Sequence, residues 1–290
     1  MLSSHPEWRE ALGSFQTEGA WIVGDWQTVR ENVRNGLAKY SPEYALAKVL
    51  LAMHDNDLQR FPAILHDARQ HLGTPIIAAG RDGYRRAYDS ALHLHMVHEL
   101  EMIAQTITHF SKLTVSNQPE TAQMVAARLT TMLDERLGVT MPTFKSREPL
   151  LSLRRSAIGT SAQSQVWAKN EVGALWLSSA KTARKANHFQ TAYSASLQAD
   201  QLGTPFSFIQ AAKLIRANGE QDKALRELDA GLSYQVPKLM LKESLKESTN
   251  DSKFIDLTNE DDNSTTQSDF NVKYTNLKAK VCFITSRFYH

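Results

Sequence analysis

The stretch from Trp167 to Leu232 constrains the fold more than any other part of this sequence. It contains four short stripes of apolar residues spaced three or four positions apart, a spacing that places them on one face of a helix. The breaks between stripes contain Asn, Gly and Pro, which are typical of helix ends and tight turns. The stripes are Trp176/Ala180/Ala183, Phe189/Tyr193/Leu197, Phe208/Ala212/Ile215 and Leu225/Leu228/Leu232, and the breaks are Asn187-His188, Leu202 to Pro205 and Asn218-Gly219. The stretch predicts two helical hairpins, with Thr204 as the N-cap of the third helix and Pro205 at its first position.

The two predicted hairpins also resemble each other. Ala180-Lys181 recurs as Ala212-Lys213, a spacing of about 32 residues that is close to the tetratricopeptide period. A related pattern of helix, polar turn and helix lies upstream, between Tyr44 and Phe61. One hairpin cannot bury its apolar face alone, so such units stack on their neighbours. We therefore expect an all-α fold, an α-solenoid of TPR/HEAT-like helical hairpins.

Further helices are expected on the amino-terminal side, and they define a predicted domain organisation. A first hairpin turns near Gly24-Asp25, Ser41-Pro42 begins the next helix, and Gly73 to Pro75 is expected to break the chain. Long helices follow. The predicted segments are 1–72 with hairpin repeats, 73–165 with long helices and a connecting loop, 166–234 with two TPR-like hairpins, 245–271 as a disordered acidic insert, and 272–290 as the start of a further, truncated repeat.

Composition excludes several classes of protein. The net charge of +2 over 290 residues gives no overall nucleic-acid footprint, and no direct nucleic-acid site is visible. Cys282 is the single cysteine, which excludes an internal disulfide and favours a reducing compartment. No apolar run is long enough to span a bilayer, and the first residues lack the pattern of a secretory signal. We expect a nuclear or cytosolic chain without a membrane partner.

No catalytic constellation is present. The sequence lacks glycine-rich phosphate loops, the nucleophile elbow and the kinase catalytic motifs. Of the clustered histidines, only His95 and His98 share a helix face with Glu99, and no further ligand completes a metal set, so structural or solvated histidines are expected. Arg154-Arg155 ends an apolar stretch, either to grip a phosphate or acid or as an ion-paired or exposed face. We expect no catalytic residue, metal or cofactor.

The acidic insert contains one short motif whose residue pattern is typical of a protein-binding segment. Ile255-Asp256-Leu257-Thr258 is followed by Asn259-Glu260-Asp261-Asp262, so alternating apolar residues precede an acidic tail. Such a segment adds a strand to the edge of a partner's sheet. It resembles the hydrophobic-acidic motif that binds SUMO. A plain solvated loop is the alternative interpretation.

The order of motifs resembles the FAT region of the phosphatidylinositol-3-kinase-related protein kinases, closest to the ATR-type checkpoint kinases of fungi. The motifs are collinear over about residues 16–232, an order that a generic tetratricopeptide array would not reproduce. They comprise Glu18 to Trp21 with Asp25-Trp26, Leu46 to Phe61, Ala78 to Tyr88, His93 to Glu101, Glu148 to Arg155, Trp176 to Lys185, Gln190 to Tyr193 and Ala211 to Leu214.

The resemblance implies a helical scaffold that supports a carboxy-terminal serine/threonine kinase domain, absent from this chain, in a nuclear protein of the DNA damage checkpoint. It further implies an ATRIP-type partner, which brings such kinases to single-stranded DNA coated by RPA. The acidic insert from about Thr249 departs from the family pattern and leaves the placement of the last repeat open. The alternative function is a stand-alone helical-repeat adaptor for protein–protein interaction. No catalytic residue transfers to this chain.

Overall fold

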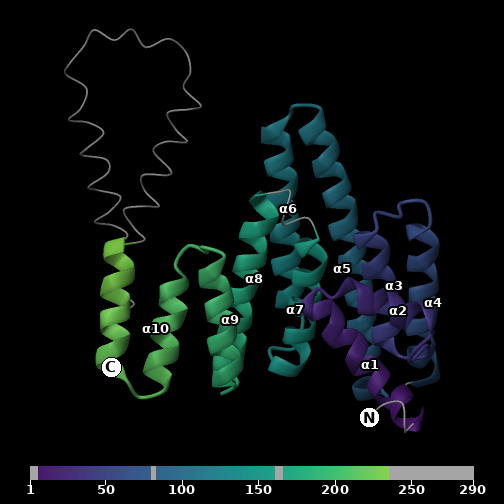
Figure 1. The fold of residues 1–290 in the computed structure, drawn as a ribbon, viewed down its shortest axis with the longest axis horizontal. Coiled ribbons are helices and arrows are strands. Elements are labelled where there is room, and N and C mark those ends of the chain that lie inside the picture. Colours follow the sequence, from purple (N-terminus) through teal and green to yellow (C-terminus); the bar gives the residue numbers. More distant parts are fainter. Residues whose placement is uncertain (1–5, 80–82, 161–165, 235–290) are drawn as a thin grey trace. The chain divides into compact units, whose positions relative to one another are not determined.

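A computed structural model describes residues 6–79, 83–160 and 166–234. Within these ranges the regular elements are helices, as expected, and none is a strand (Figure 1). The helices are α1 (Pro6–Val23), α2 (Trp26–Arg34), α3 (Pro42–His54), α4 (Phe61–Ala79), α5 (Tyr84–Val115), α6 (Pro119–Gly138), α7 (Phe144–Gly159), α8 (Val166–Lys185), α9 (Phe189–Gln201), α10 (Ser207–Ala217) and a last helix over 221–234. This confirms the all-α class, and the chain divides into two compact units, Met1–Thr182 and Ala183–His290.

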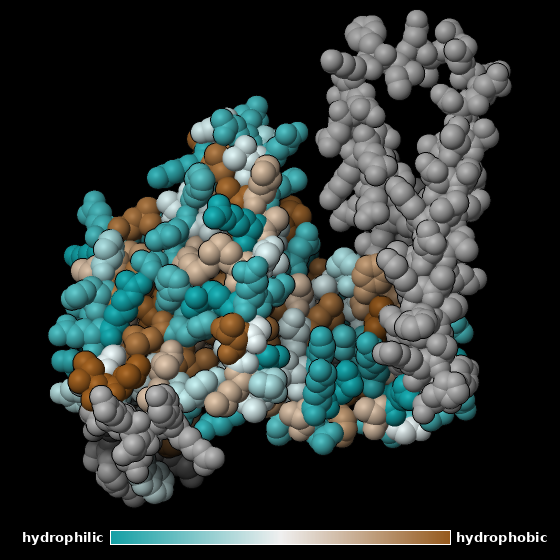
Figure 2. All heavy atoms as spheres, turned by 180° about the vertical axis from the view of Figure 1, so that it is seen from behind, coloured by the Kyte–Doolittle hydropathy of each residue, from teal (hydrophilic) through white to brown (hydrophobic). Residues whose placement is uncertain are grey.

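The first unit is built from helices that pack mainly on helices close to them in the chain. α1 packs on α2 and α3, α3 on α4, α4 on α5, and α5 on both α6 and α7. Fully buried aliphatic side chains from α3, α5, α6 and α7 form a continuous core, which includes Leu50, Leu100, Ile103, Leu133, Leu150 and Leu153. On the face drawn in Figure 2, hydrophilic side chains predominate and hydrophobic ones form patches between them.

Helix starts follow the local sequence signals. Ser41 accepts a hydrogen bond from the backbone N–H of Tyr44 at 3.2 Å, and Pro42 occupies the first turn of α3, as predicted. Asp25 caps α2 in the same way through Thr28. The predicted turn between α8 and α9 is closed by Asn187 at φ 62°, a left-handed conformation that Asn tolerates better than most residues.

Two local predictions are wrong. The chain was expected to break at Gly73 to Pro75, but α4 continues through these residues. Residue 72, a boundary in the predicted domain organisation, therefore lies inside a helix. The organisation itself stays a prediction. Pro75 removes one intrahelical hydrogen bond, but it is exposed, and water can satisfy the freed carbonyl. α10 begins at Ser207 rather than after Thr204, because Phe206 takes the N-cap position in a left-handed conformation at φ 62°.

The predicted acidic insert at 245–271 and the predicted repeat at 272–290 lie outside the described residues. Among the helices that the structure describes, none is both long and apolar enough to cross a membrane.

Candidate functional site

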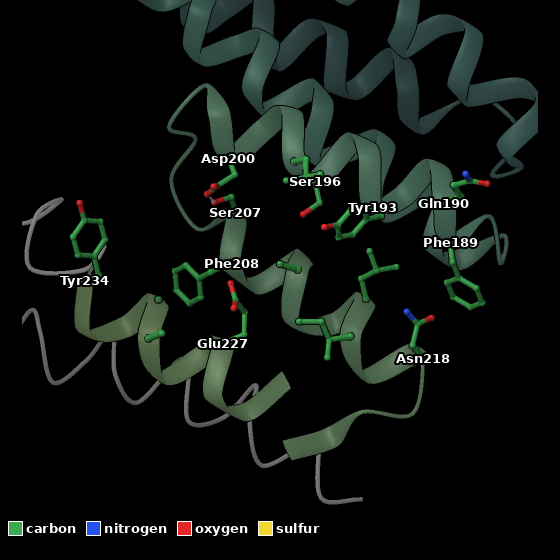
Figure 3. Close-up of a pocket in the computed structure, with 16 residues that line it drawn as sticks. Phe189, Gln190, Tyr193, Ser196, Asp200, Ser207, Phe208, Asn218, Glu227 and Tyr234 are labelled. Carbon is green, nitrogen blue, oxygen red and sulfur yellow. Dashed lines mark hydrogen bonds between the residues drawn. The ribbon is translucent and has the colours of Figure 1, made fainter. Parts of the chain in front are cut away.

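The second unit contains an apolar groove of about 780 Å³ between α9, α10 and helix 221–234. Its walls are Phe189, Tyr193, Leu197, Phe208, Ile215 and Tyr234, and Figure 3 shows aromatic side chains from all three helices around the same space. Helix 221–234 is held against α10 by a small core of Phe208, Ala212, Ala224 and Leu228. Gly231 allows this contact, since a Cβ there would overlap the ring of Phe208.

The groove exists because α9 buries its small residues and not its large ones. The sequence singled out Phe189/Tyr193/Leu197 as the apolar stripe of this helix. In the structure Tyr193 is 60% exposed and Leu197 43% exposed, and both line the groove. The buried face of α9 is instead Ala192, Ala195, Ser196 and Ala199. Small residues let neighbouring backbones approach closely, which leaves the large side chains for a different contact.

The charged groups in the lining of the groove are both acidic. Asp200 lies at the end where α9 turns toward α10, and its Oδ1 accepts a hydrogen bond from Ser207 Oγ at 3.0 Å. Glu227 enters from helix 221–234. With no Lys or Arg in this lining, the groove presents apolar surface with negative charge. Chemically it suits an apolar, cationic segment and offers no nucleophile with an adjacent base.

A second site, a cluster of charged side chains, lies in the core of the first unit and is centred on Glu99. This carboxylate of α5 is fully buried and receives two hydrogen bonds from Arg154 of α7, Nε to Oε2 and Nη2 to Oε1, both at 2.7 Å. Arg154 Nη2 also donates to the Leu133 carbonyl of α6 at 2.8 Å, and Arg136 Nε donates to Glu99 Oε1 at 3.3 Å. One arginine thus ties together three helices.

Electrostatics keep Glu99 ionised in this core. Burial alone would raise its pKa, but hydrogen bonds from His95 and Arg154 and the positive charge of Arg154 outweigh burial, so the pKa of Glu99 is lowered. His95 Nε2 lies 2.9 Å from Glu99 Oε1, and Arg136 Nη2 lies 3.0 Å from His95 Nδ1. A guanidinium has no acceptor, so Nδ1 accepts from Arg136, while the buried Nε2 faces Glu99 Oε1 without a well-aligned hydrogen bond.

Arg155 of α7 forms a separate set of contacts, which includes two residues of α8. Its Nη2 donates to Glu148 Oε1 at 2.8 Å, its Nη1 donates to Ser179 Oγ, and its guanidinium lies 3.9 Å from the centre of the Trp176 ring. Burial lowers the pKa of Arg155, while Glu148 acts in the opposite direction. Cation–π stacking on a tryptophan is stabilising when both groups are desolvated.

These contacts decide between the two interpretations of the arginine pair. Arg154 and Arg155 are both buried and both ion-paired, so ion pairing is confirmed for this chain's own carboxylates and the exposed-face expectation is wrong. Sequence reasoning placed Glu99 on the His95 face but missed it as the centre of the cluster. The available signal was a charge between apolar residues at helical spacing: Met96 and Ile103 flank Glu99 on α5, and Leu150 and Ile158 flank Arg154 on α7.

The histidines of α5 do not assemble a metal site. His95 faces Glu99, His98 Nδ1 lies 3.4 Å from Glu101, and burial lowers the pKa of His93. No group of three or more metal-ligating side chains occurs in the described part of the chain. The SUMO-type motif at Ile255, Asp256, Leu257 and Thr258 lies outside the described residues and stays a prediction.

Comparison with known proteins now gives the family. The model of the FAT domain family matches residues 13–289. The chain is 30% identical over 242 residues to the serine/threonine-protein kinase ATR of Arabidopsis thaliana, which covers 80% of this chain and 9% of that protein. It is 31% identical over 224 residues to ATR of Oryza sativa subsp. indica, 74% of this chain and 8% of that protein. ATR of Drosophila melanogaster is 27% identical over 164 residues, 54% of this chain and 6% of the relative.

This chain therefore spans less than a tenth of the length of these relatives. The match to the family model extends over nearly the whole sequence. The chain belongs to the FAT domain family, as an ATR-like FAT region of the phosphatidylinositol-3-kinase-related protein kinases.

Proposed function

We propose that this chain is the FAT scaffold of an ATR-like serine/threonine kinase that acts in the nucleus at the DNA damage and replication checkpoint. The observation that carries the proposal is the FAT match over residues 13–289, together with relatives that are ATR kinases. The scaffold supports a kinase domain of the same parent chain and contacts an ATRIP-type partner. A stand-alone adaptor is not favoured, since the relatives contain this region within much longer kinases.

The polar contacts inside the first unit support a scaffold role. Glu99 and Arg154 connect α5 and α7 through buried, charge-assisted hydrogen bonds, and Arg136 of α6 adds a part-buried one. Such bonds are directional and leave few alternative packings. A scaffold transmits position only if its helices keep a fixed spacing. SUMO binding through Ile255 and Leu257 is a further proposal, tested by loss of capture on immobilised SUMO in the double alanine variant.

Sequencing the transcript beyond the codon of His290 tests the parent context. A kinase reading frame downstream supports the proposal, and a transcript with none refutes it. The scaffold role needs a second experiment in the full-length kinase, in which Arg154→Met is compared with Lys145→Met. Both changes replace a cation on α7 by methionine, but Lys145 is exposed.

The expected result is reduced phosphorylation of a Ser-Gln peptide by the Arg154→Met kinase, while the Lys145→Met kinase keeps wild-type activity. Pull-down of the ATRIP-type partner should fall in parallel. The refuting result is equal peptide phosphorylation by the two variants under conditions in which Arg154→Met is shown to have destabilised the core. That result would rule out a supporting role for this unit.

A further inference from the structure

The groove between α9, α10 and helix 221–234 is an unfilled apolar surface in the described part of the chain. Tyr193, 60% exposed, and Leu197, 43% exposed, lie in it although α9 has already buried its alanine face. A side-chain row of this kind, bounded by helices on both sides, accepts another amphipathic helix through anchors spaced at i, i+3, i+4 and i+7. The question is which helix fills it.

The same chain contains a segment with the matching pattern. Tyr274, Leu277, Val281, Ile284 and Phe288 follow one another at intervals of three, four, three and four. On a helix these five side chains form a single stripe, and the opposite face carries Ala279 and Ser286 together with one large apolar residue, Phe283. A helix over 274–288 is about 22 Å long, comparable with the roughly 20 Å of α9.

Charge distinguishes this segment from a generic apolar helix. Residues 272–290 contain Lys273, Lys278, Lys280 and Arg287 and no Asp or Glu. The groove has Asp200 and Glu227 in its lining and no cation. Cations that flank the apolar stripe can therefore face carboxylates at the groove while the stripe covers its apolar walls, which favours this pairing over one with an acidic helix.

The connection is long enough for the segment to reach the groove. Roughly 40 residues separate Tyr234, at the end of the last described helix, from Tyr274, and a flexible chain of that length spans about 35 Å on average. The intramolecular linkage also gives a high effective concentration, so modest contact energy suffices. We propose that residues 274–288 dock as an amphipathic helix in the groove of α9, α10 and helix 221–234.

Hydroxyl-radical footprinting of the full 290-residue chain tests the docking directly, because it reports the solvent access of individual side chains. Tyr193 lies in the groove, and Tyr40, 80% exposed and outside the groove, is an internal reference. Docking predicts severalfold lower labelling of Tyr193 than of Tyr40. The variant Leu277→Asp/Ile284→Asp should raise labelling of Tyr193 to the level of Tyr40.

A matched control separates docking from a general effect of charge. Ala279→Asp/Ser286→Asp adds the same two charges at the same seven-residue spacing, but on the opposite face of the helix, and should leave Tyr193 protected. In the groove, Leu197→Asp should expose Tyr193 and raise the labelling of Phe288. Ser194→Asp, an exposed position of α9 outside the groove, should change neither.

Three results would overturn the proposal. Strong labelling of Tyr193 in the unmodified chain means an open groove. Protection of Tyr193 that survives Leu277→Asp/Ile284→Asp but disappears on dilution means that a second copy of the chain occupies the groove. Equal loss of protection in both double-aspartate variants means that charge alone, and not the apolar stripe, produced the effect. Near-ultraviolet circular dichroism confirms that each variant keeps its fold.

Discussion

Arg154→Met tests whether the buried cluster around Glu99 holds the first unit together. Arg154 is 1% exposed and makes two hydrogen bonds to Glu99 and one to the Leu133 carbonyl. Its loss leaves a fully buried carboxylate with Arg136, at 3.3 Å, and His95 as remaining partners. Breaking a buried ion pair from one side typically costs about 3–5 kcal/mol. Because Arg136 partly compensates, we expect a loss of about 3–4 kcal/mol in the free energy of unfolding.

Urea denaturation followed by tryptophan fluorescence measures this loss in the full chain. The five tryptophans are Trp8, Trp21, Trp26, Trp167 and Trp176, and all lie in the unit that contains the cluster. A loss of 3–4 kcal/mol corresponds to a fall of about 1–2 M in the urea midpoint. Lys145→Met, on the same helix but exposed, should leave the midpoint unchanged.

The pH dependence gives a second and independent signature. The pKa of Glu99 is lowered in the folded protein, so its contribution to stability is present above the unfolded pKa of about 4.3 and is lost as the pH falls through the folded pKa. In Arg154→Met, burial without its main partner raises the pKa of Glu99 instead. The destabilisation by Arg154→Met should therefore be larger at pH 7 than at pH 4.

The double variant Glu99→Met/Arg154→Met completes the thermodynamic cycle. Removing both charges leaves no unpaired ion among the fully buried groups, since Arg136, which loses Glu99, has a side chain that is 26% exposed, so the double variant should cost less than Arg154→Met alone. A cost below about 1 kcal/mol for Arg154→Met at pH 7, as for an ordinary surface pair, would refute this account of the core. So would a double variant whose cost equals the sum of the two single changes.

Three further predictions concern other parts of the chain. Burial raises the pKa of Glu171 above its unfolded value, so the ionised side chain destabilises the fold above the folded pKa. Glu171→Gln keeps an acceptor for the Thr130 hydroxyl but removes the charge. It should raise the urea midpoint slightly at pH 7 and not at pH 4. Gly231→Ala places a methyl group against Phe208 and should cost about 1–3 kcal/mol, read as a loss of helical signal on mild heating. Ser41→Ala removes the cap of α3 and should cost about 1 kcal/mol in the same urea assay.

The sequence by itself predicted the helices and most of their turns, because those signals are local. The stripes from Trp176 to Leu232, the Ser41-Pro42 start and the Asn187 turn each depend on residues within one or two helical turns. A signal of this kind fails where the surroundings tolerate a residue that usually ends a helix. Pro75 lies at an exposed position of α4, where water can satisfy the freed carbonyl, and the helix continues.

The family resemblance also came from the sequence, since collinear motifs survive when single positions drift. The candidate sites did not come from the sequence. Glu99 and Arg154 lie 55 residues apart, and neither local spacing nor composition indicates that they pair. The large side chains of α9 were expected to face the core, yet the structure buries its alanines and leaves Tyr193 and Leu197 at the groove.

Both outcomes have one physical cause. A helix forms through hydrogen bonds to residues four positions away, so its presence and ends are encoded nearby. Which face it buries, and which charge it meets, depends on the free energy of packing against elements that are distant in the chain. The sequence determined the helices and the family, and the tertiary structure decided the partner of Glu99 and the position of the groove.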